Sequence, residues 1–273
     1  MSEVLEKVAG VLGFSEPLPE RMKYHANDSS LDVMNVVRRE VMIENARARA
    51  RPPSLDEEGF ALFRHVSAVK DFLDAEEVQR VHDEEIRKLL LELTGADDVE
   101  VRGTGILRFG EKSKNSGALN NSKPARFVHI DVSDATAATF NARSPLLAGR
   151  KVRRAAQYNV WRALSPPPQD VPLAVCDARS LAPEDLIFAD AVFDRDGVPV
   201  FSFEGLVIRH NPNQRWAFFP DMRLDEVLVF KTNDSDPGRA HHVPHGAFDD
   251  PTCPSDTPPR ASIEMRGAAF WYD

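Results

Sequence analysis

The chain has 273 residues, of which 42% are hydrophobic, so it can bury a substantial core as one large domain or two small ones. Its formal net charge of −9 and the lack of a long run of Lys or Arg argue against a nucleic-acid partner. No apolar stretch approaches the roughly 18–20 residues that a membrane span needs, and the acidic N-terminus makes a poor signal peptide, so we expect a soluble cytoplasmic protein.

Two helices and one strand are predicted in the first part of the chain. Residues 31–50 carry apolar side chains at helical intervals, and the two prolines that follow Arg51 would end that helix. Residues 59–67 are typical of a strand. A second helix begins at Asp74, which can cap its N-terminus, and it ends at Gly95. Its apolar positions form one buried stripe. They are Val78, Val81, Ile86, Leu89, Leu90 and Leu93.

From about residue 100 the pattern changes to short strands separated by turn residues, including a hairpin turn at 195–197. Many short strands with Pro- and Gly-containing connections indicate a sandwich or a barrel. We therefore expect an α+β, mainly β protein in which residues 1–273 form a single domain. Residues 1–98 would be a mainly helical N-terminal part that packs on a barrel formed by residues 99–273.

The segment "RFVHIDV" at 126–132 is the first with a chemical signal. His129 and Asp131 alternate with apolar residues, so on a pleated strand they point to the same face. A carboxylate that faces inward needs a cation, a metal or several hydrogen-bond donors. Taken alone, this tripeptide is also compatible with an edge strand whose polar face is simply solvated.

A histidine downstream makes the motif more informative, because two histidines and one carboxylate form the facial triad that holds Fe(II) with open positions. The candidates are His241, His242 and His245, and we choose His245. The long separation between His129 and His245 predicts an insertion among the intervening strands.

Beyond the histidines, Arg260 and Ser262 again share one strand face. A planar guanidinium beside a hydroxyl suits the bidentate binding of a carboxylate, such as the distal carboxylate of 2-oxoglutarate. The order H-x-D, then H, then R-x-S is more specific than any one of its parts.

With these residues the sequence resembles the non-heme iron, 2-oxoglutarate-dependent oxygenases. More narrowly, it resembles the family of the cephamycin methoxylation protein and of the fungal gibberellin desaturase-like and asperfuran-cluster hydroxylase/desaturase proteins. The resemblance covers about residues 55–270. The segments that carry it are "RFVHID" (126–131), "YNVWRAL" (158–164), "PLAVCDARSL" (172–181), "FFPDMRLDEVLVFK" (218–231), "PHGAFDDP" (244–251) and "PPRASIEMR" (258–266).

The resemblance implies a double-stranded β-helix, the cupin-like jelly roll, with flanking N-terminal helices. It implies that His129, Asp131 and His245 bind Fe(II), and that Arg260, assisted by Ser262, binds 2-oxoglutarate. With O2 as the second cosubstrate, such an enzyme hydroxylates, desaturates or cyclises a natural product or an amino-acid-derived molecule. It does so by hydrogen abstraction with a ferryl species.

Three residues of the "NVWR" stretch are further candidates for lining the active site: Asn159, Trp161 and Arg162. Trp161 is better explained as a core residue and Arg162 as a structural ion-pair partner. Two other functions remain open. One is a cupin-type isomerase or hydrolase that uses the metal without 2-oxoglutarate, and the other is a jelly roll that only binds a ligand.

Overall fold

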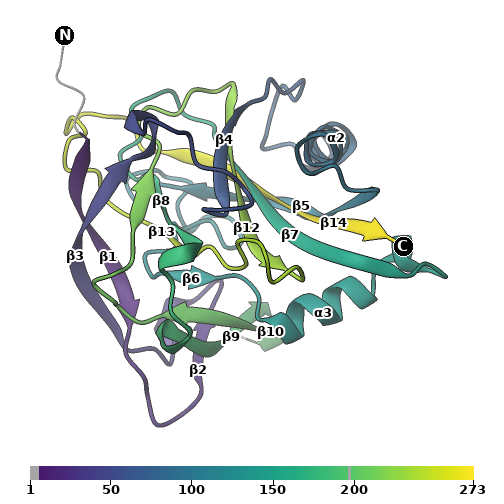
Figure 1. The fold of residues 1–273 in the computed structure, drawn as a ribbon. Helices are drawn as coiled ribbons and strands as arrows, with labels where there is room; N and C mark the ends of the chain where they lie inside the picture. Colours follow the sequence, from purple (N-terminus) through teal and green to yellow (C-terminus); the bar gives the residue numbers. More distant parts are fainter. Residues whose placement is uncertain (1–5, 196–197) are drawn as a thin grey trace.

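Two β-sheets form the body of the protein in a computed structural model that describes residues 6–195 and 198–273 (Figure 1). The larger sheet runs, in spatial order, through β1 (Lys7–Ser15), β3 (Val36–Asn45), β11 (Trp216–Phe218), β8 (Leu173–Cys176), β13 (His245–Ala247), β6 (His129–Ile130), β10 (Val198–Ile208), β9 (Leu186–Arg195) and β2 (Met22–His25). The smaller sheet runs through β4 (Phe60–Arg64), β12 (Glu226–Asp234), β7 (Val152–Ala163), β14 (Ala261–Tyr272) and β5 (Asp98–Phe109).

The sheets pack against each other through a buried apolar cluster to which both contribute. Val175 on β8 and Ala217 on β11 meet Trp161 on β7 and Phe230 on β12. Strands that are distant in sequence are neighbours in both sheets, as the expected jelly roll requires. The mainly β prediction is therefore confirmed.

Alternation along β7 separates two environments. Tyr158 and Val160 pack with Leu89 and Leu90 of helix α2 (Asp83–Thr94), on the outer face of the smaller sheet. Asn159 and its neighbours at every second position face the larger sheet instead. The outer face thus packs against helix α2, and the inner face carries both the apolar contact between the sheets and polar side chains such as Asn159.

The predicted helix from Asp74 to Gly95 is confirmed. Asp74 accepts hydrogen bonds from the backbone N–H groups of Glu76 and Glu77 and so caps α1 (Ala75–Glu77). A π-helical turn (Val78–His82) joins α1 to α2, and Gly95 ends α2 in the left-handed conformation with φ of 63°. The strand predicted at 59–67 is β4.

The helix predicted at 31–50 is wrong, because residues Val36–Asn45 form strand β3. β3 pairs antiparallel with β1 in continuous register, with Val8 opposite Ile43. The segment is rich in β-branched residues, and pairing with a distant strand outweighs its helical spacing. Residues 1–98 are therefore not mainly helical where the structure describes them.

The other elements are short or lie at the edges. A third helix that the sequence did not predict, α3 (Asp134–Ala142), follows β6 directly and lies beside β10. Strands β9 and β10 pair antiparallel, as the predicted hairpin requires, whereas its turn residues Asp196 and Gly197 lie outside the described residues. Within the described ranges, no helix has the length and apolar composition needed to cross a membrane.

Candidate metal centre and cosubstrate pocket

His129, Asp131 and His245 come together between the two sheets. His129 on β6 and His245 on β13 are direct partners across an antiparallel strand pair, and their ring centroids are 4.3 Å apart. Asp131 follows β6, and its Oδ1 lies 3.7 Å from Nε2 of His129. One ligand atom from each of the three side chains lies within 4.8 Å of the others, and all three residues are buried. We call this set the inner triad.

Both histidines of the inner triad are held in the tautomer that suits a metal ligand. Nδ1 of His129 lies 3.1 Å from the carbonyl oxygen of Phe127, and Nδ1 of His245 lies 3.2 Å from that of Val243. A carbonyl oxygen only accepts, so each Nδ1 carries the proton and each Nε2 keeps a free lone pair. Burial lowers the pKa of His129 to about 3 and also lowers the pKa of His245, so both rings are neutral at pH 7.

Asp131 stays ionised although it is buried. Burial by itself would raise its pKa, but the Arg266 guanidinium, the two histidines and a hydrogen bond from Asn159 together hold the pKa well below its usual range. Nδ2 of Asn159 donates to Oδ2 at 2.6 Å, and Nη2 of Arg266 donates to Oδ1 at 3.0 Å. Two neutral imidazoles and one carboxylate are the donor set of an Fe(II) facial triad, so these residues fit the metal that the sequence predicts.

Arg260 is a buried guanidinium that forms no ion pair with the residues that the structure describes. Only 1% of the residue is exposed, and Nη1 donates to the carbonyl oxygen of Val171 at 2.9 Å. Its Nε and Nη2 have no hydrogen-bond partner among the residues that the structure describes. Burial lowers the pKa of Arg260 to about 9, a measure of how poorly this charge is compensated. A bound carboxylate would satisfy both nitrogens, as expected for the distal end of 2-oxoglutarate.

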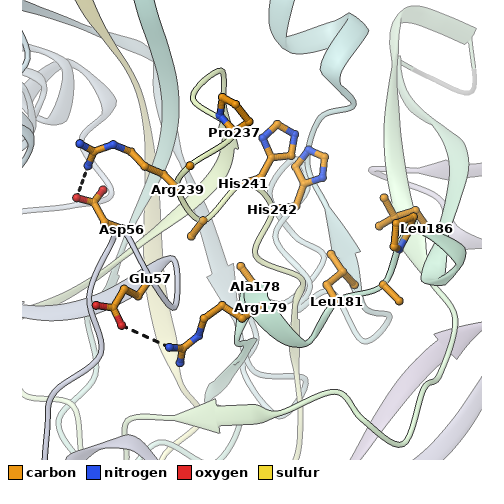
Figure 2. A pocket seen from close by; sticks show the side chains of 14 residues that line it. Asp56, Glu57, Ala178, Arg179, Leu181, Leu186, Pro237, Arg239, His241 and His242 are labelled. Carbon is orange, nitrogen blue, oxygen red and sulfur yellow. Dashed lines mark hydrogen bonds and ion pairs between the residues drawn. The ribbon is translucent and has the colours of Figure 1, made fainter.

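Two cavities meet at Asp131 and Arg266. One, of about 280 Å³, is lined by Tyr24 and Arg108 among others and reaches His129. The other, of about 270 Å³, has an aromatic wall and also borders Asn159. The wall consists of Phe140, Phe193, Phe201 and Phe203. A third cavity, of about 470 Å³, is lined by residues outside the inner triad, among them the ion pair of Asp56 with Arg239 (Figure 2).

The other site residues predicted from the sequence lie in different environments. Asn159 lies beside the inner triad, as its hydrogen bond to Asp131 shows. Trp161 packs in the core, with the Arg260 guanidinium 5.6 Å from its ring centroid. Arg162 points to the opposite face of β7, where it donates to the carbonyl oxygen of Leu224. Ser262 is buried next to Arg260, and its hydroxyl donates to the carbonyl oxygen of Arg108 at 3.4 Å.

Sequence reasoning missed Arg266 and Glu264. Both share the inward face of β14 with Ser262, and Arg266 donates to Glu264 at 3.2 Å as well as to Asp131. Burial raises the pKa of Glu264, and the nearby Asp131 raises it further. The period-two alternation that paired Arg260 with Ser262 extends to both positions, so the signal was present in the sequence.

Comparisons with known proteins show which family this chain resembles. A family model described as an oxidoreductase/YMDC permease-like domain matches residues 14–270. The hydroxylase/desaturase CTB9 of Cercospora beticola is 31% identical over 86% of this chain and 77% of its own length. The alpha-ketoglutarate-dependent dioxygenase phiK of a fungal species (strain ATCC 74256) is 30% identical over 80% of this chain and 79% of its own.

A solved structure gives the same result for the fold. The iron and alpha-ketoglutarate-dependent endoperoxidase NvfI superimposes with a TM-score of 0.85 and 25% identity, over 99% of this chain and 100% of its own. The chain therefore belongs to the family of iron- and 2-oxoglutarate-dependent oxygenases that includes these dioxygenase and hydroxylase/desaturase proteins.

Proposed function

We propose that this chain is an Fe(II)- and 2-oxoglutarate-dependent dioxygenase that hydroxylates, desaturates or cyclises a small natural product or amino-acid-derived molecule. In this proposal the inner triad holds the iron, and Arg260 binds the distal carboxylate of 2-oxoglutarate with help from Ser262. The observation that carries the proposal is a triad of two neutral imidazoles and one ionised carboxylate in the same interior as an uncompensated buried guanidinium.

Iron, when bound with 2-oxoglutarate and O2, supplies the oxidising power that breaks a substrate C–H bond. The chain's own residues prepare the site for this chemistry. Asn159 and Arg266 fix the carboxylate of Asp131, and the backbone carbonyls of Phe127 and Val243 fix the two imidazoles. The surrounding residues would then orient the substrate and keep water away.

The aromatic cavity is the place we propose for an apolar part of the substrate. Phe193 and Phe203 border both cavities next to Asp131, so a ring or alkyl group held there lies beside the metal ligands. Of the three residues that sequence reasoning offered for the substrate, Asn159 alone lines this cavity. We therefore assign Trp161 to packing against Arg260, and Arg162 to a structural role.

We further propose that residues 1–273 act as one domain. β1 and β3, from the N-terminal part, belong to the same sheet as the strands that bear His129 and His245. Both cysteines, Cys176 and Cys253, are free thiols, which suits the cytoplasm that we propose as the compartment.

The two alternatives make different predictions about Arg260. A cupin-type isomerase or hydrolase would use the inner triad without 2-oxoglutarate, and a ligand-binding jelly roll would need neither. The uncompensated guanidinium favours the dioxygenase, because the other two functions leave its burial unexplained.

The proposal is tested by adding Fe(II), ascorbate, O2 and 2-oxoglutarate to the purified protein. Succinate should form as 2-oxoglutarate is consumed, and 2-oxoglutarate should bind the Mn(II)-loaded protein anaerobically. Arg64→Ala is the control variant for changes at Arg260, because Arg64 is exposed on β4 and pairs with Asp225. It should bind and consume 2-oxoglutarate as the wild type does. Metal-loaded protein that neither binds nor consumes 2-oxoglutarate would contradict the proposal.

A further inference from the structure

A second group of metal-ligating side chains lies outside the inner triad. Oδ1 of Asp134 is 2.8 Å from Nε2 of His241 and 3.3 Å from Nε2 of His242, and the two imidazole centroids are 3.9 Å apart. One ligand atom from each residue lies within 4.8 Å of the others. We call Asp134, His241 and His242 the outer cluster.

The ligand atoms of the outer cluster face one another as hydrogen-bond acceptors. Nδ1 of His241 lies 2.6 Å from the carbonyl oxygen of Asp234, so Nδ1 carries the proton of a neutral ring. Nε2 of that ring then points a lone pair at the carboxylate of Asp134, and two acceptors face each other. Nε2 of His242 faces the same carboxylate oxygen at 3.3 Å. A divalent ion held between these three ligand atoms would be bound by each of them.

Neighbouring groups hold the ligands of the outer cluster in fixed orientations. Nδ2 of Asn233 donates to Oδ1 of Asp134 at 2.8 Å, which fixes the orientation of the carboxylate. Asp134 is the first residue of α3, and the positive end of the helix dipole helps to keep it ionised. The carbonyl of Asp234 orients His241 in the same way as backbone carbonyls orient the two histidines of the inner triad.

Access from solvent is open on both sides of the outer cluster. The side chain of Asp134 is 71% exposed. His241 and His242 line the cavity of about 470 Å³, and Figure 2 shows their rings side by side at its edge. An ion that reached them could complete its coordination with water from this cavity.

The outer cluster joins the same two segments as the inner triad. Asp131 and Asp134 lie on one segment, from β6 into α3, and His241, His242 and His245 lie on the other. A cation held by Asp134 and the two outer imidazoles would tie the start of α3 to the segment that leads into β13. The inner triad joins these segments at a second point.

We propose that the outer cluster is a second divalent-metal site, for a transition ion of the Zn²⁺ class that takes imidazole and carboxylate ligands. The bound ion braces the two segments that carry the inner triad. The site does not depend on the proposed dioxygenase activity, since binding to it can be counted without turnover.

The test counts bound metal in apoprotein titrated anaerobically with Co²⁺, by absorption and by elemental analysis. The wild type should bind two equivalents, and the variant with both His129→Ala and Asp131→Ala should bind one. His241→Ala should also bind one, and its remaining outer ligands should bind Zn²⁺ more than about 100-fold more weakly, because second-shell changes alone cost about 10- to 100-fold. Zn²⁺ should raise the melting temperature of the inner-triad variant.

The same measurements separate failure of this proposal from failure of the proposed function. One equivalent in the wild type that His241→Ala leaves unchanged would overturn the outer site, and the outer cluster would then be a hydrogen-bonded His–Asp group. One equivalent that His241→Ala removes and the inner-triad variant retains would support the outer site and contradict the dioxygenase. His210→Ala is the matched control, because His210 contacts Phe14 apart from both groups and the variant should keep two equivalents.

Discussion

The inner triad and the outer cluster consist of the same side chains, two histidines and one aspartate, in different surroundings. The side chain of Asp131 is 8% exposed, whereas that of Asp134 is 71% exposed. Burial makes the inner imidazoles neutral, and by itself it would raise the pKa of Asp131, which Arg266, the two histidines and Asn159 together hold low. The outer carboxylate has His242 and His241 as partners, and water and a helix N-terminus also stabilise its charge.

This difference separates a reaction centre from a surface site. The interior around the inner triad places charged groups close together where water screens them little, so each of them depends on its partners. Removing one member there leaves another buried charge uncompensated, which costs several kcal/mol. At the outer cluster, water replaces a missing partner, so single changes should have smaller effects.

The largest effect is expected for Asp131→Ala. This change removes the only carboxylate of the inner triad and leaves Arg266 with Glu264 as its remaining acidic partner. Formation of succinate from 2-oxoglutarate in the presence of Fe(II) should fall to background. Asp134→Ala is the matched change at the outer cluster, and turnover in that variant should fall far less. Comparable losses in the two variants would contradict the division into two kinds of site.

The next largest effect is expected for Arg260→Ala, which should mainly weaken binding of 2-oxoglutarate. Removing one partner of a buried charged pair costs about 2–5 kcal/mol, which corresponds to a roughly 30- to several-thousand-fold rise in Kd. Anaerobic titration of the Mn(II)-loaded protein with 2-oxoglutarate measures this Kd. Arg260→Lys keeps the charge without the planar guanidinium, so its Kd for 2-oxoglutarate should lie between those of the wild type and Arg260→Ala. Normal affinity in Arg260→Ala would refute the assignment of this anchor.

The sequence was sufficient to pair His129 with Asp131, but not to predict the segments around them. His129, Asp131 and Arg260 could be found because residues two apart on a strand share a face, whatever the strand pairs with. Strand β3 could not be predicted in this way, because Val37, Val41 and its other apolar residues also fit a helical spacing. Only pairing with β1 decides between a helix and a strand.

The choice among the three downstream histidines shows the same limit. Local sequence does not reveal which of them will lie opposite His129 across a strand pair, and the structure assigns that position to His245. His241 and His242 were considered only as alternatives for that one role. Their contact with Asp134 depends on where α3 begins, and the sequence pattern had not predicted this helix.

A smaller effect is expected for Asn159→Ala. Its amide donates to Oδ2 of Asp131 and orients the carboxylate toward the two imidazoles. Loss of a second-shell partner of this kind reduces metal affinity by about 10- to 100-fold. Competition for Fe(II) or Mn(II) with a chelator of known affinity measures the change. Unaltered affinity would show that Arg266 alone is enough to position Asp131.

The smallest effect is expected for Asn233→Ala, the corresponding change at the outer cluster. Asn233 donates to Oδ1 of Asp134 at 2.8 Å, but the exposed carboxylate can accept a hydrogen bond from water instead. The net loss is that of one solvent-accessible hydrogen bond, about 1 kcal/mol, so Zn²⁺ should bind the outer cluster about fivefold more weakly. The titration is best performed on protein whose inner triad is already disabled by His129→Ala and Asp131→Ala. A loss as large as that of Asn159→Ala would mean that the outer carboxylate is positioned as strictly as the inner one, and that burial does not account for the difference between the two sites.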